Sequence, residues 1–495
     1  MGLARTMDVR RIWRVPMAWA LVGLATLTLI RLAVAAVIPL APDEAYYWVW
    51  SRALAPGYLD HPPMVALWIR AGTALAGSGS IGVRLLGPIS GVLGSFFLYD
   101  AAERLFPGGR AGLTAAALLN ATLALGIGTE IMTPDTPLLL FWAATLWAGA
   151  RLASGGAPAW WLAAGAFSGL ALASKYTAGL LPIGMGLFAL IAAPRWLRRP
   201  EPWLGALVAG LLFLPVLIWN ARNGWAGFLR QGGRVFDWRP EQAVGNIGEL
   251  LLGQIGMATP GIFILFTAGV AVAVVRTMQS RDPAWTLLMA MSVPALVLFS
   301  QHAVGGRVQG NWPAIVYPAS AAAAAGLPAA IWRRLTWPSI GLGLVVTATV
   351  YGHVVTAWPT ASARNDPIAR QLFGWETLAA RAENARHQAG AEFVAVEPYG
   401  LAAELARGLP AGVQVIGAGA HWEPTTLLKA EIGQREGILV RPEAFGGPDP
   451  AAWRDWTRLT SIVRNNGDVV LERYSVFLVR AVAGSSSTVV VLPHP

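Results

Sequence analysis

The residues best suited to chemistry in this chain lie between positions 42 and 63, which read PDEAYYWVWSRALAPGYLDHPP. These 22 residues contain three carboxylates, five tyrosine and tryptophan rings, a histidine and an arginine, among them Asp43, Glu44, Asp60, His61, Arg52 and Tyr46. Because two acids are adjacent, one could hold a proton or a metal ion while the other orients it. The same pattern also fits an interfacial loop, with aromatic rings at the lipid headgroups and solvated acids.

A fourth acid, Asp135, lies in the segment TPDTP at 133–137. Pro134 suits the first position of a helix, which predicts that Asp135 sits in the first turn, where the helix dipole favours a negative charge. An ordinary carboxylate at a helix start would show the same pattern. If the four acids share one side of a membrane, they could hold a divalent cation or deprotonate a hydroxyl group.

Cationic and polar residues further along the chain could bind an anion. Lys175, in ASKYTAG, is one of only two lysines, and it either extends toward the membrane surface or contacts a phosphate. His61 could hydrogen-bond a phosphate, bind a metal or cap the next helix. In QHAVGGRVQGNWPAIVYPA, backbone amides with Arg307, Gln309 and Asn311 could cradle an oxyanion, although a polar turn would explain the same residues.

The composition indicates a membrane protein. Of the 495 residues, 55% are hydrophobic and 13% are charged, whereas soluble domains carry about 25% charged residues. No cysteine is present, which excludes disulfides and cysteine-bound metals. The net charge of +10 comes from arginines dispersed in short loops, so a nucleic-acid partner is not predicted. Apolar runs of bilayer-crossing length predict eleven transmembrane helices, at 17–40, 83–105, 111–129, 135–152, 160–174, 176–193, 203–220, 258–276, 284–300, 311–330 and 339–358.

Loop charges predict the orientation of these helices. If the N-terminus is cytoplasmic, every cytoplasmic loop carries arginine, as the positive-inside rule requires. The outer side then holds residues 41–82, 221–257, 301–310 and everything after about residue 360. Residues 62–82 are apolar but too short to span, which predicts a helix along the interface. The long loop 221–257 fits either an ordinary connection or a functional lid. Residues 1–360 are interpreted as a transmembrane domain with an outward-facing site.

Residues 361–495 have the character of a soluble α/β domain on the outer, periplasmic face. A charged helix comes first, and AEFVAVE, GVQVIGAG, ILVRPEAFG and RYSVFLVRAV predict strands, with a helix around 400–407 between the first two. The closing SSSTVVVLPHP predicts a loosely held tail. The segment GAGAHW lacks the spacing and the helix of a dinucleotide-binding loop, so no nucleotide site is predicted.

The outer acids, cations and aromatic rings together predict a reaction between a lipid phosphate and an acceptor on the outer face. With these motifs in place, the chain resembles the polytopic glycosyltransferases of the GT-C fold. The likeness is to the bacterial branch of lipid A galacturonosyltransferase-like proteins, aminoarabinose transferases and relatives of protein O-mannosyltransferases. It covers the first span to about residue 320 and rests on Asp43-Glu44, YYWVWSRALAPGY, Asp-His-Pro-Pro at 60–63, TPDTP, SKY at 174–176 and Arg-x-Gln-x-Asn-Trp-Pro at 307–313.

The resemblance implies an enzyme of the bacterial inner membrane that moves a sugar from a polyprenyl-phosphate donor to an envelope acceptor, usually with inversion. The acceptor could be lipid A, another glycan, a lipid or a protein. The resemblance implies that Asp43 is the catalytic base, with Glu44 beside it and Asp135 as the second acidic position. A carboxylate would take the proton of the acceptor hydroxyl, while Lys175, Arg307 and His61 would stabilise the departing phosphate.

The residues expected to bind substrate or phosphate are Asp60, His61, Lys175, Tyr176, Arg307, Gln309, Asn311, Tyr46 and Arg52. The reaction requires no nucleotide, and the one cofactor considered is a divalent metal held by Asp43, Asp60 and Asp135. Aminoarabinose transferases have a lysine where this chain has His61, so the acceptor and any metal stay open at this point.

Two other classes also fit a polytopic protein with charges at membrane level. A transporter or flippase of lipid-linked sugars often shows two related halves and broken helices at the midplane. Here the acids cluster at one face and no half-repeat is found, which favours surface chemistry. A non-catalytic partner could hold a lipid and use the C-terminal domain as a docking surface.

Overall fold

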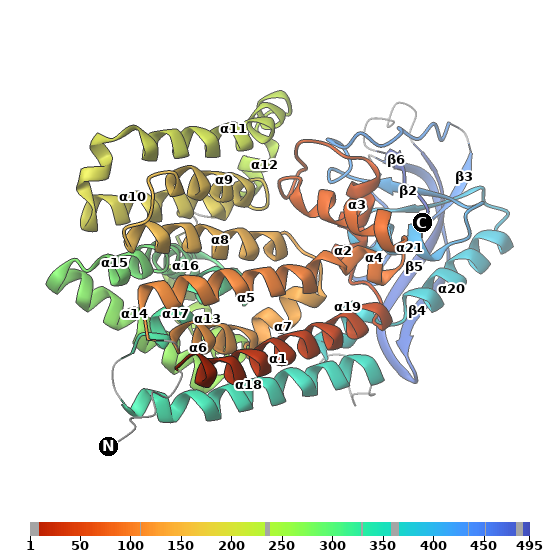
Figure 1. Ribbon diagram of the computed structural model, residues 1–495. Coiled ribbons are helices and arrows are strands. Elements are labelled where there is room, and N and C mark those ends of the chain that lie inside the picture. The colour runs from red at the N-terminus through yellow and green to blue at the C-terminus, as the bar shows by residue number, and fades with distance from the viewer. Residues whose placement is uncertain are drawn as a thin grey trace, which may run out of the picture.

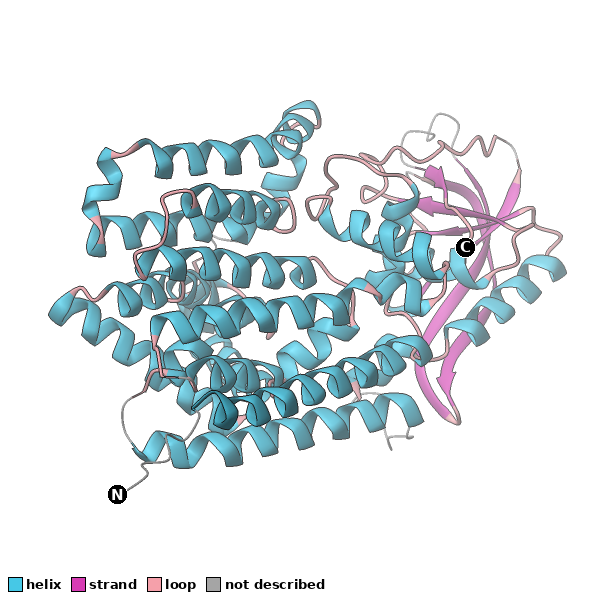
Figure 2. Cartoon of the chain, viewed as in Figure 1, coloured by secondary structure: helices cyan, strands magenta, loops and turns pink. Residues whose placement is uncertain are grey.

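The computed structural model describes residues 9–108, 110–232, 238–327, 330–357, 366–433, 435–450, 452–481 and 489–495. A bundle of helices is followed by a mixed β-sheet with its own helices (Figures 1 and 2). The predicted domain boundary at residue 360 lies outside the described residues, between α18 and α19.

Helices occupy every segment in which the sequence predicts a span. The predicted interfacial helix at 62–82 forms two helices, α3 and α4. The bundle and its outer segments contain α1 (Val9–Val37), α2 (Pro42–Arg52), α3 (Met64–Ala76), α4 (Ser80–Arg84), α5 (Leu86–Leu105), α6 (Ala111–Asn120), α7 (Leu123–Glu130), α8 (Asp135–Ala153), α9 (Trp160–Leu172), η1 (Tyr176–Gly179), α10 (Leu180–Ala192), η2 (Pro194–Arg198), α11 (Pro200–Arg222), α12 (Ala226–Gly232), α13 (Pro240–Ala258), α14 (Pro260–Ser280), α15 (Pro283–Ala290), α16 (Val293–Gly305), η3 (Trp312–Val316), α17 (Tyr317–Ala325) and α18 (Ala330–Thr356).

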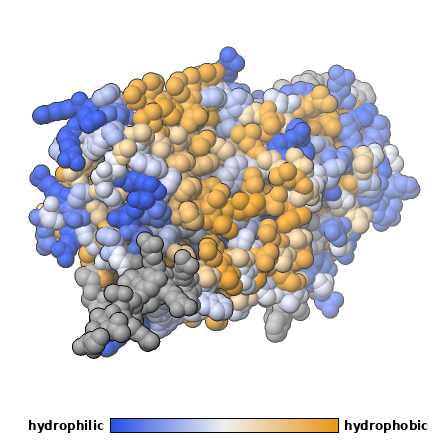
Figure 3. All heavy atoms as spheres, viewed as in Figure 1, coloured by the Kyte–Doolittle hydropathy of each residue, from blue (hydrophilic) through white to orange (hydrophobic). Residues whose placement is uncertain are grey.

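The helical part has the character of a membrane-spanning bundle. Within the described residues, six helices are long and apolar enough to cross a membrane, or seven if α6 and α7 form one span with a 64° bend. Figure 3 shows hydrophobic residues gathered over the middle of this part, with hydrophilic residues at its left edge. The chain is therefore a multi-pass membrane protein, and the number of eleven crossings stays a prediction.

Close helix contacts and polar groups at helix breaks explain how the bundle packs. A Cβ atom at Gly165 of α9 would lie 2.0 Å from the carbonyl oxygen of Gly205 in α11, so only glycine permits this approach. At the break between α6 and α7, the hydroxyl of Thr122 accepts a hydrogen bond from the backbone N–H of Leu125 at 3.2 Å. Such bonds satisfy backbone groups that would otherwise be exposed to lipid.

The C-terminal part is the predicted α/β domain. In its described residues, helices α19 (Pro367–Leu372), α20 (Trp375–Gln388), α21 (Tyr399–Gly408) and η5 (Glu443–Phe445) accompany a sheet with strand order β4-β5-β3-β1-β2-β6. The strands are β1 (Phe393–Val396), β2 (Gln414–Ala418), β3 (Glu436–Pro442), β4 (Trp453–Asn466), β5 (Val469–Ala481) and β6 (Val489–Val491).

Parallel pairing joins β1 to β2 and β3, and antiparallel pairing adds β5 beside β3 and β4 beside β5. The prediction of a loose C-terminal tail is wrong for residues 489–492, because β6 pairs antiparallel with β2 and Leu492 is buried. The apolar run VVVL supplies the buried side chains that hold this end of the chain against the sheet.

The two parts share a hydrophobic core at their junction. Buried residues of α2 and the first outer loop, such as Tyr46 and Trp48, form one cluster with Leu405 of α21 and Val394 of β1. Figure 1 shows the C-terminal domain beside α2, α3 and α4, at the end of the bundle opposite the connections α10–α11 and α14–α15. The helix that carries Asp43 and Glu44 thus lies at the junction between the bundle and the sheet domain.

Candidate active site

Helix α2 begins at Pro42 and carries Asp43 and Glu44 in its first turn. Proline suits this position because its missing N–H would have no helical partner there, and acids are favoured by the positive end of the helix dipole. The Glu44 carboxylate folds back and accepts a hydrogen bond from the backbone N–H of Ala41 at 3.0 Å. Consecutive residues of a helix point about 100° apart, so the two acids face different neighbours.

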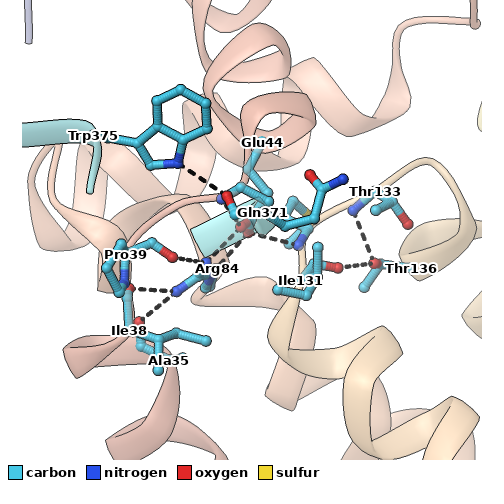
Figure 4. Close-up of polar contacts among 12 residues, drawn as sticks. Ala35, Ile38, Pro39, Glu44, Arg84, Ile131, Thr133, Thr136, Gln371 and Trp375 are labelled. Atoms are coloured by element: carbon cyan, nitrogen blue, oxygen red, sulfur yellow. Dashed lines mark hydrogen bonds and ion pairs between the residues drawn. The ribbon is translucent and has the colours of Figure 1, made fainter. Parts of the chain in front are cut away.

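Glu44 faces the protein interior and forms a fully buried ion pair with Arg84 of α4 (Figure 4). Arg84 Nε donates to Glu44 Oε1 at 2.7 Å, and its guanidinium also donates to the carbonyl oxygens of Ile38 and Pro39, each at 2.8 Å. The backbone N–H of Met132 donates to Glu44 Oε1 at 2.9 Å. This set, named here the Glu44–Arg84 anchor, joins the end of α1, the start of α2 and the segment that leads into α8.

Asp43 faces the C-terminal domain instead. Its Oδ1 accepts a hydrogen bond from the hydroxyl of Tyr399, the first residue of α21, at 3.1 Å. Asp43 is exposed at the surface, yet the protein around its carboxylate removes part of its hydration and thereby raises its pKa; the Tyr399 hydrogen bond opposes this rise, and the charges of Asp60 and Glu44 add to it. A raised pKa makes the ionised carboxylate a stronger base, which suits proton abstraction from a hydroxyl group.

Tyr46, one turn after Asp43, contacts both Asp60 and the ring of Tyr399. The buried Tyr46 hydroxyl donates to Asp60 Oδ2 at 3.2 Å. Its ring centroid lies 4.3 Å from that of Tyr399 and 5.2 Å from that of Trp422. Aromatic rings from the first outer loop and from the C-terminal domain therefore form one cluster beside the two carboxylates.

A chain of polar contacts continues from Asp60 across α12 to the C-terminal domain. Arg230 of α12 donates from Nε to Asp60 Oδ1 at 3.3 Å and from Nη2 to Nε2 of His421 at 3.3 Å. Gln231 donates to the backbone oxygen of Asp60 at 2.8 Å. Burial lowers the pKa of His421, which favours the neutral ring that accepts from Arg230. The loop at 221–257, interpreted as either a connection or a functional lid, thus contacts the candidate site through α12.

Asp135 forms a second acidic group at the start of α8. Its Oδ1 accepts from Lys175 Nζ and its Oδ2 accepts from Asn311 Nδ2, both at 2.7 Å. Lys175 is only 8% exposed, and its ammonium lies 5.6 Å from the ring centroid of Trp312. Three residues predicted from separate motifs therefore meet at one point.

Two adjoining cavities open beside this group. The first, of about 300 Å³, is largely apolar and is lined by His61, Lys175, Tyr176, Thr177, Phe228, Gln231, Gly232, Leu298, Phe299, His302 and Trp312. The second, of about 730 Å³, shares His302 and Trp312 with the first and is also lined by Arg307, Gln309 and Glu249. An apolar cavity with a cation in its wall suits a lipid chain that carries an anionic headgroup.

The residues Asp60 and His61 lie between the two acidic groups. Asp60 accepts from Tyr46 in the cluster around Asp43, whereas His61 lines the cavity that Lys175 also lines. Asp43 and Asp135 have different direct partners, and the consecutive pair at 60 and 61 connects their surroundings. The predicted site thus consists of two groups, one around Asp43 and one around Asp135, with Asp60 and His61 between them.

Other predicted residues lie at the margin of this arrangement. Arg52 is at the opposite end of α2, about 14 Å along the helix from Asp43, and it contacts Thr73 and Ser51. Arg307 is 79% exposed and pairs with Glu249 at 2.7 Å. The structure therefore brings Arg307 to the larger cavity and directs Arg52 toward α3.

The predicted metal ligands do not converge. Among the residues that the structure describes, no group of three or more histidine, aspartate or glutamate side chains could hold a metal ion. Asp43 binds Tyr399, Asp60 binds Tyr46 and Arg230, and Asp135 binds Lys175 and Asn311. The three carboxylates do not fit a shared cation in this arrangement.

The sequence did not predict the partners of the two adjacent acids, which give Glu44 and Asp43 different surroundings. Arg84 lies 40 residues from Glu44, and Tyr399 lies 356 residues from Asp43. Arg84 lies at the start of the span predicted at 83–105, and this place was the available signal, because a charge at that depth needs a partner. No local pattern around Tyr399 or His421 indicated a role in a site formed by the first outer loop.

Comparison with known structures identifies the fold. ArnT from Cupriavidus metallidurans, in the crystal structure bound to undecaprenyl phosphate, superposes with a TM-score of 0.65 at 16% identity, over 95% of this chain and 99% of that chain. The apo structure of ArnT from the same organism gives a TM-score of 0.62, at 16% identity over 94% of this chain and 98% of that chain. The chain therefore has the GT-C fold of ArnT, with a sheet domain at the C-terminus.

Comparison of sequences defines the enzyme class. The sequence model of the family described as dolichyl-phosphate-mannose-protein mannosyltransferase matches residues 60–219. Lipid A galacturonosyltransferase RgtD from Rhizobium johnstonii is 28% identical over 376 residues, which cover 73% of this chain and 76% of RgtD. The predicted resemblance to GT-C membrane glycosyltransferases is confirmed, and the protein is a glycosyltransferase.

Proposed function

We propose that this protein transfers a sugar from a polyprenyl-phosphate donor to a hydroxyl group of an envelope acceptor, on the periplasmic face of the bacterial inner membrane. The observation that supports this most directly is the apolar cavity that Lys175 and His61 both line. Through Asp60, the neighbour of His61, this cavity adjoins the cluster around Asp43. A lipid-linked donor and a candidate base would thus be close to each other.

The donor phosphate is proposed to bind at Lys175. This ammonium is nearly buried, pairs with Asp135 and lies beside the Trp312 ring, so the singly charged phosphodiester of the donor would share a cation that two partners hold in place. His61 and Tyr176 line the same cavity, and Arg307 and Gln309 line the adjoining one together with residues next to Asn311. Undecaprenyl phosphate bound to ArnT supports this class of donor.

Asp43 is proposed as the general base. Its carboxylate takes the proton of the acceptor hydroxyl as that oxygen forms a bond to the anomeric carbon. The bond between the anomeric carbon and the phosphate oxygen breaks, and the polyprenyl phosphate leaves with the bonding electrons. Attack opposite the departing phosphate inverts the anomeric configuration. Lys175 stabilises the charge that develops on the phosphate.

Glu44 is assigned a positioning role rather than direct contact with substrate. Its oxygens already accept from Arg84, Ala41 and Met132, and the side chain is fully buried. The Glu44–Arg84 anchor holds the backbone on which Asp43 lies and the segment three residues before Asp135. It thereby sets the separation of the two acidic groups.

Topology and acceptor complete the proposal. With a cytoplasmic N-terminus and eleven crossings of residues 1–360, the first outer loop 41–82, loop 221–257 and the domain 361–495 lie in the periplasm. The position of the C-terminal domain, at the end of the bundle opposite the α10–α11 and α14–α15 connections, agrees with this orientation (Figure 1). By analogy with RgtD, lipid A or a related envelope glycolipid is the acceptor to be tested first.

The test incubates the purified full-length protein with a panel of polyprenyl-phosphate sugars and lipid A species, and identifies products by mass spectrometry. The expected result is a glycosylated acceptor together with released polyprenyl phosphate, formed by the wild type and not by Asp43→Asn. A folded Asp43→Asn protein with the normal rate would refute the role of the base. Donor movement across proteoliposomes without any glycosylated product would instead indicate a flippase.

A further inference from the structure

Tyr399 belongs to the C-terminal domain, yet its hydroxyl donates to Asp43 Oδ1 at 3.1 Å. The approach of α21 to α2 is set by the backbone, because a Cβ atom at Gly400 would lie 2.7 Å from Pro42 Cβ. Glycine at position 400 therefore allows the two helix starts to touch. This contact places the Tyr399 hydroxyl opposite the carboxylate that follows Pro42.

The ring of Tyr399 is held from two sides. Its centroid lies 4.3 Å from that of Tyr46 and 4.5 Å from that of His421. Ring contacts at these distances fix the orientation of a tyrosine largely without its hydroxyl. The hydroxyl is therefore available for its one directional contact, the bond to Asp43.

We propose that Tyr399 is a positioning residue of the transfer reaction, whose hydroxyl holds Oδ1 of Asp43 so that Oδ2 faces the acceptor hydroxyl. The C-terminal domain then completes the active site. This inference rests on the proposed function, because it assumes that Asp43 is the base. It adds a residue of the C-terminal domain, which contains none of the sequence motifs on which the predicted resemblance rests.

The inference has a pH signature. Asp43 must be ionised to accept a proton, so the rate falls as pH drops through its pKa. The Tyr399 hydrogen bond lowers that pKa, while loss of hydration and the charges of Asp60 and Glu44 raise it. Loss of the hydroxyl should therefore raise the pKa and move the acid limb of the pH–rate profile to higher pH. The titratable and charged groups around this carboxylate are Glu44 and Tyr47 on α2, Asp60 on the first outer loop, Tyr399 on α21, and beyond them Arg230 and His421.

The experiment measures kcat/KM against pH for the wild type, Tyr399→Phe and Tyr474→Phe. Tyr399→Phe should shift the acid limb upward by about one pH unit, as expected for one hydrogen bond to a charged group. The KM for the donor should stay unchanged, because Tyr399 does not line the cavity beside Lys175. Tyr474→Phe is the matched control, since its hydroxyl also contacts a carboxylate of the same domain, Glu472, and neither residue is among the groups that shift the pKa of Asp43. Its acid limb should coincide with that of the wild type.

An unshifted acid limb of the pH–rate profile in folded Tyr399→Phe would overturn the inference. Asp43→Asn, measured in parallel, distinguishes failure of this inference from failure of the proposed function. If Asp43→Asn is inactive while Tyr399→Phe keeps the acid limb of the wild type, only the positioning role of Tyr399 is refuted. If Asp43→Asn is active, the proposed base itself is wrong. If Tyr399→Phe does not fold, Gly400→Ala tests the inference instead. Its added methyl group pushes α21 away from Pro42, so the acid limb of the pH–rate profile should shift in the same direction.

Discussion

Asp43 and Glu44 are adjacent in one helix turn, yet they belong to two regions of opposite character. The Glu44 side is sealed, with a fully buried ion pair to Arg84. The Asp43 side is partly open and meets tyrosine and histidine rings from another domain. The difference shows that one turn of helix can combine a rigid support with a reactive group, because successive side chains leave the helix in different directions.

The largest expected effect tests the open side. Asp43→Asn keeps the size of the side chain and removes the negative charge, so transfer should fall by about 10²–10⁴-fold, as for loss of a general base. Single-turnover transfer by the purified enzyme measures this effect. The melting temperature should equal that of the wild type, and a rate within threefold (about 0.7 kcal/mol) of the wild type would contradict the assignment.

Substitutions in the Glu44–Arg84 anchor should lower the stability of the protein. Glu44→Gln leaves the buried Arg84 guanidinium without a countercharge, which should lower the free energy of unfolding by about 3–5 kcal/mol. Unfolding in detergent measures this, with Glu249→Gln as control. The Glu249–Arg307 pair is largely exposed, so its loss should cost less than about 1 kcal/mol. Equal destabilisation by Glu44→Gln and Glu249→Gln would contradict the claim that the Glu44–Arg84 anchor contributes more stability than an exposed ion pair.

Lys175→Met should weaken donor binding. Replacement of the ammonium by an apolar group of similar length should raise the KM for the donor by about 10–100-fold, since hydrogen bonds to charged groups contribute about 1.5–3 kcal/mol. Lys429→Met is the matched control, because that lysine lies in the C-terminal domain. An unchanged KM in Lys175→Met would place the donor phosphate elsewhere.

The smallest effect is expected at Arg307. This side chain is 79% exposed and lines the larger cavity, so Arg307→Gln should raise the KM for the donor by less than about fivefold. The difference from the wild type should shrink as salt is added, because exposed charges are screened. Titration of donor at several ionic strengths tests this, and a large effect that does not depend on salt would show a closed, desolvated contact instead.

Periodicity and hydropathy predicted the helices well, because each apolar run is long and bounded by glycine, proline or arginine. They could not predict the break between α6 and α7, where Asn120 and Thr122 make polar contacts that only the folded bundle supplies. Strand β4 was missed because it is largely exposed and rich in charge, and it is stabilised by pairing with β5. The brief apolar run of β6 was too short to stand out.

The acids were identified from the sequence, whereas the different roles of Asp43 and Glu44 were not. Nothing in the dipeptide Asp43-Glu44 shows which side chain faces inward, since that depends on Arg84, on the loop before Asp135 and on α21. The meeting of Lys175, Asp135 and Asn311 followed from their shared predicted side of the membrane. Tyr399 could not be found this way, because the contact depends on the docking of a separately folded sheet domain.

The contact between Tyr399 and Asp43 also has a consequence for biogenesis. Translation delivers Asp43 long before Tyr399, because 356 positions separate the two residues in the chain. Until the C-terminal domain docks, the carboxylate lacks the hydroxyl that lowers its pKa. Under the proposed positioning role of Tyr399, the active site would thus stay incomplete until the last part of the chain has folded.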